Sequence, residues 1–394
     1  MTQHAARLWD KGQPLDELIH RFTVGDDPTW DLRLVHWDCL GSAAHAHTLL
    51  RADILTDAEL AALLDGLREI DADCRAGRFA IPPELEDAHT AIEARLTQRC
   101  GPAGEKIHTG RSRNDQAATA ARLFLRAEAA ARLSQLGDLV DAALARIERD
   151  GAIEMPGYTH MQAAMPSSVG QWLHAFVEAG LDHMQALAAL FDRLDACPLG
   201  TGAGFGVPLP LDRGYTAELL GFSRVQRSPI DVQNSRGRME LYFARAAADA
   251  AAMIEKLACD LLLFSTAEFG FFRMPESLTT GSSIMPQKRN PDVLELMRGR
   301  AARLRGRAVE LEFVIGKLPS SYHRDLQLTK EPAIRAADEI DQLLSVSRHV
   351  IASFEIDRER LTAAMRPELF AAEAALRRTQ AGVPFRQAYR QVAE

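Results

Sequence analysis

Long stretches with apolar residues at helical spacing dominate this chain and restrict what it can fold into. They cover residues 117–151, 169–196, 239–269, 293–315 and 331–354. Several of them exceed the usual globular helix of about 8–20 residues, and β-branched clusters are few. Because helices of this length need apolar partners along much of their surface, the pattern predicts an all-α fold built around a long central helix bundle.

Polar connectors rich in glycine and proline separate these stretches, and no strand alternation occurs beyond isolated hairpin candidates. The texture of the sequence changes near residues 108 and 354. These changes predict an N-terminal helical domain (1–108), a central long-helix bundle (109–354) and a shortened C-terminal domain (355–394).

Composition excludes several classes of protein. Of the 394 residues, 47% are hydrophobic and 25% are charged, which is ordinary for a soluble globular protein. The net charge of −8 argues against broad nucleic-acid binding, which normally needs a basic face. The five cysteines are far apart and form no C-x-x-C pair, so a zinc site is disfavoured and a reducing compartment is indicated. The N-terminus lacks the apolar core of a signal peptide, and no apolar run approaches the length of a membrane span. These features predict a cytoplasmic protein without membrane partners.

Two polar stretches carry candidate binding and acid–base groups. In "KIHTGRSRNDQ" (106–116), Ser112, Arg113 and Asn114 precede a long helix, where unpaired N–H groups favour a carboxylate or phosphate. An ordinary capped helix start would explain them equally well. In "PGYTHMQ" (156–162), His160 could exchange protons near neutral pH, with Thr159 and Gln162 beside it, or could be a structural histidine.

Two further stretches combine helix signals with polar groups. In "GSSIMPQKRNP" (281–291), Asn290 and Pro291 predict an N-cap and a first helical residue. Glu295 then lies early in the helix, where an acid is favoured. Helix signals do not explain Gly281, Ser282 and Lys288, which are typical of a mobile loop that closes over an anion. In "SSYHRDLQLTK" (320–330), the polar residues either share one face that binds substrate or form solvated surface; they are Tyr322, Arg324, Gln327 and Lys330.

The order of these motifs carries a family resemblance. "GSSIMPQKRNP" resembles the signature loop of the fumarase/aspartase superfamily, and "HTGRSRNDQ" with "PGYTHMQ" resembles its argininosuccinate lyase branch. "EDAHTAIEARL" (86–96) and "GVPFRQAY" (382–389) are similar to that family too, so the resemblance extends from about Leu8 to the chain end. It implies β-elimination of argininosuccinate to arginine and fumarate, without metal or organic cofactor.

The resemblance also implies roles for the catalytic residues. Ser282 would be the base that removes a proton beside a carboxylate, and Lys288 and loop N–H groups would stabilise the oxyanion. His160 would protonate the leaving nitrogen, with Glu295 as its charge-relay partner. Family members assemble as homotetramers whose sites combine residues of three subunits, so a homotetramer with shared sites is expected.

The remaining candidate residues would bind substrate. Carboxylates would be held by Ser112, Arg113, Asn114, Thr159, Lys288 and Asn290, and the argininyl portion by Tyr322, Gln327 and Lys330. Asp87 would meet the amino or guanidinium end, and Gln162, Arg236 and Arg324 complete the set.

This chain departs from the family pattern in its substrate-binding segments. Family members usually carry Asn-Lys where this chain has His323-Arg324, and Arg does not reproduce the compact geometry of Lys. The segment 22–31 has no clear counterpart of a substrate-binding serine. Two alternatives therefore stay open: a lyase that releases fumarate from another N-substituted aspartate, and a catalytically silent structural homologue.

Overall fold

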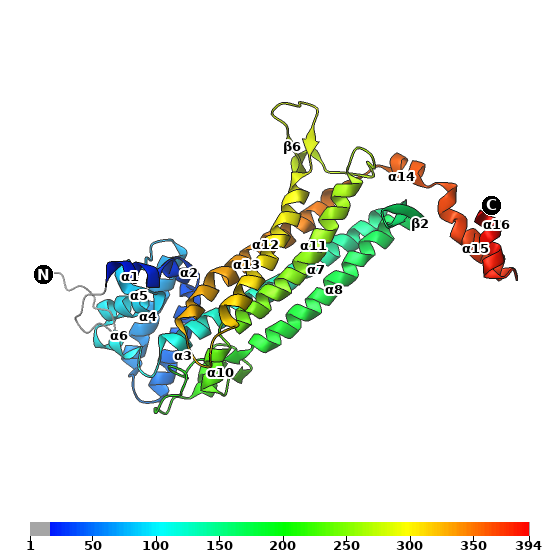
Figure 1. Cartoon of the computed structure of the whole chain (residues 1–394). Helices are drawn as coiled ribbons and strands as arrows, with labels where there is room; N and C mark the ends of the chain where they lie inside the picture. The colour runs from blue at the N-terminus through cyan, green and yellow to red at the C-terminus, as the bar shows by residue number, and fades with distance from the viewer. Residues whose placement is uncertain (1–15, 394) are drawn as a thin grey trace. The chain divides into compact units, whose positions relative to one another are not determined.

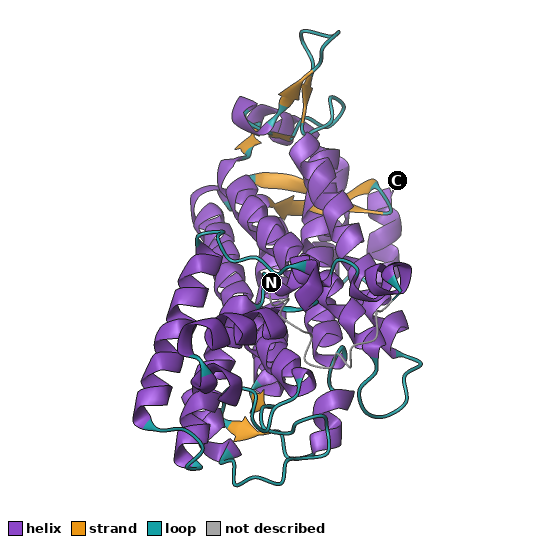
Figure 2. Cartoon of the chain, turned by 90° about the vertical axis from the view of Figure 1, so that its left-hand side faces the viewer, coloured by secondary structure: helices purple, strands orange, loops and turns teal. Residues whose placement is uncertain are grey.

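Five long helices form the framework of the computed structural model, which describes residues 16–393. They are α7 (Arg113–Asp150), α8 (Val169–Leu194), α11 (Arg238–Phe264), α12 (Asp292–Ile315) and α13 (Lys330–Ser353). Each coincides with a stretch of apolar periodicity, and the strands between them are short (Figure 2). The predicted all-α class is confirmed. No helix within residues 16–393 has the length and hydropathy that crossing a membrane requires.

Helix ends differ from the sequence prediction where side-chain hydroxyls compete with the helix. The pattern predicts that α11 continues to Phe269, but the helix ends at Phe264. Ser265 Oγ donates to the Leu261 carbonyl and Thr266 Oγ1 donates to the Leu263 carbonyl, at 2.8 Å for the threonine. Hydroxyls that bond preceding carbonyls in this way compete with the helical ladder.

The chain divides into two units, each made of three separate segments. The first unit comprises residues 1–131, 187–246 and 305–338, and the second comprises 132–186, 247–304 and 339–394. All five long helices contribute residues to both units. The predicted division into three consecutive regions stays a prediction, and its first 15 residues lie outside the described chain.

The first unit contains the N-terminal helices and the loops that carry most candidate binding residues. Its other helices are α1 (Glu17–Val24), α2 (Asp27–Asp31), α3 (Val35–Arg51), α4 (Asp57–Arg75), α5 (Ala88–Cys100), α6 (Pro102–Lys106), α9 (Arg213–Leu219) and α10 (Pro229–Asn234), with the 3-10 turns η1 (Pro83–Leu85) and η3 (Arg324–Thr329). β3 (Ala196–Cys197) pairs in parallel with β4 (Arg224–Val225). Buried Leu49, Leu63 and Leu96 join α3, α4 and α5 in one apolar core. Figure 1 labels these three helices in the N-terminal part of the chain.

The second unit is held by an aromatic cluster. Trp172 lies 5.1 Å from Phe272 and 6.1 Å from Phe354, measured between ring centroids, and its Nε1 donates to Asp260 at 2.9 Å. Three antiparallel pairs belong to this unit: β1 (Glu154–Thr159) with β2 (Gln162–Ser168), β5 (Phe272–Arg273) with β8 (Glu355–Ile356), and β6 (Thr280–Gly281) with β7 (Arg289–Asn290). The turn η2 (Glu276–Leu278), α14 (Arg358–Ala364), η4 (Pro367–Phe370), α15 (Ala371–Gln380) and α16 (Phe385–Ala393) complete it.

Candidate active site

The start of α7 is capped by its own side chains. Ser112 Oγ accepts a hydrogen bond from the Asn114 N–H at 3.2 Å, and Asp115 Oδ1 accepts one from the Ser112 N–H at 2.9 Å. The other Asp115 oxygen accepts from the Gly200 and Gly202 N–H groups, at 3.1 and 2.9 Å. Asp115 was not among the predicted site residues, although an acid three residues after a serine is a capping signal. This buried carboxylate fixes the helix start that carries Arg113 and Asn114.

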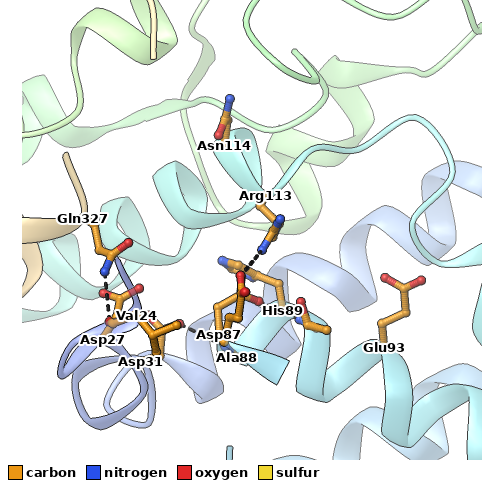
Figure 3. A network of polar contacts seen from close by, with 12 residues as sticks. Val24, Asp27, Asp31, Asp87, Ala88, His89, Glu93, Arg113, Asn114 and Gln327 are labelled. Carbon is orange, nitrogen blue, oxygen red and sulfur yellow. Dashed lines mark hydrogen bonds and ion pairs between the residues drawn. The ribbon is translucent and has the colours of Figure 1, made fainter. Parts of the chain in front are cut away.

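Asp87 links the start of α5 to the start of α7. Its carboxylate caps α5 by accepting from the Thr90 N–H at 2.8 Å, and it accepts from Arg113 Nη1 at 2.6 Å (Figure 3). Burial alone would raise the Asp87 pKa, but the charges of His89 and Arg113 and these hydrogen bonds hold it below its usual value. Asp87 is therefore an ionised residue with a fixed orientation.

Lys330, at the start of α13, lies between two carboxylates of α2. Its Nζ is 2.8 Å from Asp27 Oδ2 and 2.5 Å from Asp31 Oδ1. Asp27 and Asp31 are four residues apart and therefore lie on one helical face. Burial would lower the Lys330 pKa, but the two aspartates raise it well above its usual value. The amine is thus a fixed cation, and sequence reasoning missed both partners.

Donors on η3 bind the C-terminal end of α1. Gln327 Nε2 donates to the Thr23 and Val24 carbonyls, at 3.1 Å each, and Arg324 Nη2 donates to the Thr23 carbonyl at 3.0 Å. These donors satisfy carbonyls that a helix end leaves without partners. In the same unit, the Arg236 guanidinium lies 5.3 Å from the centroid of the Tyr322 ring.

A cavity of about 190 Å³ in the first unit collects eight of the predicted binding residues. They are Asp87, Arg113, Asn114, Arg236, Tyr322, Arg324, Gln327 and Lys330. Its wall also includes Val24, Asp27, Glu86, His89 and Ala117, which the sequence did not indicate. The ninth predicted residue of this unit, Ser112, lines a more open cavity of about 570 Å³ with Arg113 and Asn114. Segments far apart in the sequence therefore form one strongly charged pocket.

Buried His89 supports the acidic side of this pocket. Its Nδ1 lies 2.6 Å from Asp38 Oδ2, and both side chains are less than a tenth exposed. Burial would lower the His89 pKa, but the charges of Asp38, Asp87 and Asp31 and the bond to Asp38 raise it above its usual value. No group of three or more His, Cys, Asp or Glu side chains suited to a metal ion occurs among residues 16–393.

The predicted acid lies in a hairpin of the second unit, where the sequence analysis expected a loop. His160 and Met161 form the two-residue turn between β1 and β2, with φ angles of 54° and 61°. Positive φ at both positions is typical of tight hairpin turns, whose twist matches that of the strands. Thr159 and Gln162 flank the turn as a cross-strand pair, and all these side chains are exposed.

The predicted base lies in the loop between β6 and β7 of the same unit. Ser282 Oγ accepts hydrogen bonds from the Ile284 N–H at 3.3 Å and from the Met285 N–H at 3.1 Å. Such donors favour the negative charge of an alkoxide over the neutral hydroxyl. Thr280 Oγ1 donates to Asp292 at 2.8 Å and fastens the loop to the start of α12. Lys288 is exposed. Figure 1 shows the loop that follows β6 beyond the end of α12.

The prediction that Asn290 is the N-cap of α12 is wrong. The helix begins at Asp292, and Asn290 belongs to β7, where its Nδ2 donates to the Gly281 carbonyl at 3.4 Å. The Asn290 side chain therefore bonds the other strand of the hairpin and does not cap the helix. Glu295 lies in the first turn of α12, as the sequence predicts, and is exposed.

The three proposed catalytic residues lie on separate segments of the second unit: Ser282 in the β6–β7 loop, His160 in the β1–β2 turn and Glu295 in α12. Within the described residues, no hydrogen bond or ion pair connects any two of Ser282, His160 and Glu295. None of the three lines the cavity of the first unit. The chain therefore provides one charged pocket and, on separate hairpins, an exposed histidine and a serine oxygen with two N–H donors.

Comparisons with known proteins show the family to which this chain belongs. Residues 11–306 match the sequence model of a family described as Lyase. An argininosuccinate lyase of Sorangium cellulosum is 45% identical, with 99% of this chain aligned to 90% of that protein. The argininosuccinate lyase of Thermotoga neapolitana is 41% identical, with 98% of each chain aligned.

Solved structures with the same fold include two lyases. An EDDS lyase variant with bound fumarate is 26% identical, with a TM-score of 0.78 over 95% of this chain and 74% of that chain. Class II fumarase from Schistosoma mansoni is 16% identical, with a TM-score of 0.81 over 95% of this chain and 91% of that chain. The second similarity concerns the fold alone, and it confirms the predicted fumarase-like architecture.

Proposed function

Because the chain belongs to the argininosuccinate lyase family, we propose that it is a carbon–nitrogen lyase that splits argininosuccinate into arginine and fumarate. The observation that supports this most is the cavity of the first unit, whose wall carries both carboxylates and guanidinium groups. Argininosuccinate itself carries carboxylates, an ammonium group and a guanidinium group. Charges of both signs on one wall match such a substrate better than a purely apolar or purely basic pocket would.

We propose Ser282 as the base that removes the proton beside the substrate carboxylate. Proton removal there builds negative charge, so the reaction needs fixed donors that meet this charge as it develops. The N–H groups of Ile284 and Met285 already lie within hydrogen-bonding distance of Ser282 Oγ and would stabilise its alkoxide. Lys288, on the same loop, adds a positive charge that would stabilise the alkoxide and the substrate carboxylate.

His160 is the proposed acid that protonates the leaving nitrogen, directly or through water. Its exposed position in the two-residue turn leaves the imidazole accessible to a substrate. Glu295 is its proposed charge-relay partner. No hydrogen bond or ion pair joins His160 to Glu295 among residues 16–393, which favours a relay formed between different subunits.

The remaining candidate residues are proposed to bind the two ends of the substrate. Carboxylates are assigned to the start of α7 and to the two hairpins, through Ser112, Arg113, Asn114, Thr159, Lys288 and Asn290. The argininyl portion is assigned to Tyr322, Gln327 and Lys330, and its amino or guanidinium end to Asp87. These four residues line the same cavity, as do Arg236 and Arg324, and Gln162 completes the set of binding residues. Lys330 contributes charge and shape, because its amine already contacts Asp27 and Asp31.

A homotetramer with shared sites is the assembly that this arrangement supports. No hydrogen bond or ion pair joins Ser282, His160 and Glu295 among residues 16–393, which supports a site completed by residues of neighbouring copies. We expect light scattering to give the mass of four chains. A fully active monomer would contradict both the assembly and the shared sites.

We also propose a cytoplasmic location. All five cysteines are free thiols, and Cys39 and Cys197 are buried. Free cysteines without disulfides are usual in a reducing compartment.

The direct test is to mix the purified protein with argininosuccinate and to measure both products. Fumarate is followed by its ultraviolet absorbance, and arginine is measured after the reaction. We expect equal amounts of the two. A folded tetramer that releases no fumarate from argininosuccinate would contradict the proposed function, and other N-succinyl amines would then show whether it acts on a different N-substituted aspartate.

A further inference from the structure

An uncompensated negative charge lies in the wall of the cavity where α2 meets α13. Asp27 and Asp31 both contact the single amine of Lys330, at 2.8 and 2.5 Å. Their side chains are 10% and 3% exposed, and the lysine side chain is 11% exposed. Two carboxylates thus share one cation in a largely buried place, where an unpaired charge is costly.

The two aspartates differ in how their oxygens are used. Asp31 uses both: Oδ1 contacts Lys330, and Oδ2 accepts from the Ala88 N–H at 3.0 Å, which also helps to start α5. Asp27 uses only Oδ2, and its Oδ1 has no hydrogen-bond partner in the described chain. Asp27 lines the cavity, whereas Asp31 does not. Asp31 is therefore structural, and Asp27 has an oxygen available to a ligand.

The three arginines that line the same cavity have contacts other than Asp27. Arg113 binds Asp87 at 2.6 Å, and Arg324 donates to the Thr23 carbonyl. Arg236 lies over the ring of Tyr322. Burial, followed by the charges of Asp31 and Asp87, raises the pKa of Asp27 to about 6, although Lys330 acts in the opposite direction. A positively charged ligand group would balance the second of the two carboxylates that share Lys330.

We propose that Asp27 is a specificity-determining residue that binds the α-ammonium group of the amino-acid portion of the substrate. The inference rests on the proposed function, because that function supplies an arginine-like substrate. Tyr322, Gln327 and Lys330, to which the argininyl portion is assigned, line the same cavity as Asp27. The guanidino group of that portion carries the reacting bond, so the α-ammonium group is the cation that remains for Asp27.

Calorimetric titration tests this assignment without requiring turnover. The full-length protein and its Asp27→Asn variant are each titrated with L-arginine and with 5-guanidinopentanoate, which lacks only the α-ammonium group. We expect Asp27→Asn to weaken arginine binding roughly 10- to 100-fold, which is the range for loss of a hydrogen bond to a charged group. Binding of 5-guanidinopentanoate should be the same for both proteins.

Asp26→Asn is the matched control. Asp26 precedes Asp27, carries the same side chain and is exposed, so this variant should bind arginine like the unmodified protein. Equal weakening of both ligands by Asp27→Asn would assign the contact to the guanidinium group and overturn the proposal. Unchanged arginine binding in Asp27→Asn, or no arginine binding by the unmodified protein, would overturn it too.

Thermal unfolding separates a binding defect from a folding defect. Asp27 has a pKa above its unfolded value, so its ionised form destabilises the folded protein as the pH rises through about 6. The groups that set this pKa are Lys330, Asp31 and Asp87. Asn resembles the neutral carboxyl and does not ionise. The difference in Tm between Asp27→Asn and the unmodified protein should therefore shift in favour of the variant from pH 5 to pH 8. We expect the Asp27→Asn variant to bind arginine weakly and still to fold like the unmodified protein.

The turnover assay keeps the two hypotheses distinct. If the unmodified protein does not split argininosuccinate, the proposed function fails, whatever the titrations show. If it splits argininosuccinate and Asp27→Asn has an unchanged KM and unchanged arginine binding, only the assignment of Asp27 fails.

Discussion

Replacing Ser282 with alanine will remove almost all turnover of argininosuccinate and leave the folded assembly intact. A positioned acid or base contributes roughly 10²–10⁴-fold to the rate, and we expect kcat to fall by at least that factor. The hydroxyl is half-buried in a hairpin loop, and its partners are two N–H groups of the same loop. Its loss should therefore not disturb either unit. The measurement is the rate of fumarate release at saturating substrate, with the tetramer mass checked by light scattering.

Ser283→Ala is the matched control for this prediction. Ser283 is the next residue, carries the same side chain and is exposed. If the Ser283 variant keeps a near-normal kcat and the Ser282 variant is inactive, the base is the hydroxyl of Ser282 and not that of its neighbour. A Ser282 variant that keeps a near-normal rate would remove Ser282 from the base role.

Replacing His160 with asparagine should lower kcat by roughly 10²–10⁴-fold, with a much smaller change in KM. Asparagine suits this test because His160 has a φ of 54°, and Asn tolerates positive φ better than most residues. The hairpin turn should therefore persist while the group that transfers the proton is lost. Steady-state kinetics on argininosuccinate would measure both parameters.

His174→Asn provides the comparison. His174 is an exposed histidine on α8 of the same unit and has no proposed role in the site. Its variant should keep the rate of the unmodified protein. If His160→Asn loses only a few-fold in kcat, the histidine is structural, and the proton must reach the leaving nitrogen from another group.

The helix framework could be predicted because helical periodicity is a local property of the sequence. Apolar spacing located all five long helices, and errors were confined to their ends, where side chains compete with the backbone. Asn290 illustrates this limit. The dipeptide Asn-Pro predicts a helix cap, but the strand pair β6–β7 places this side chain against the Gly281 carbonyl instead.

The motifs by themselves determined the family, the reaction class and most of the residues that line the pocket. Only the tertiary structure decided how these residues are paired. Lys330 meets Asp27 and Asp31 across sequence separations of 303 and 299 residues, so no local pattern could reveal that its amine has two carboxylate partners. The same folding leaves one oxygen of Asp27, which lines the cavity, without a hydrogen-bond partner among residues 16–393. The difference has a physical reason: helix formation depends on neighbours three or four positions away, whereas the charge balance of a buried site depends on which distant segments pack against it.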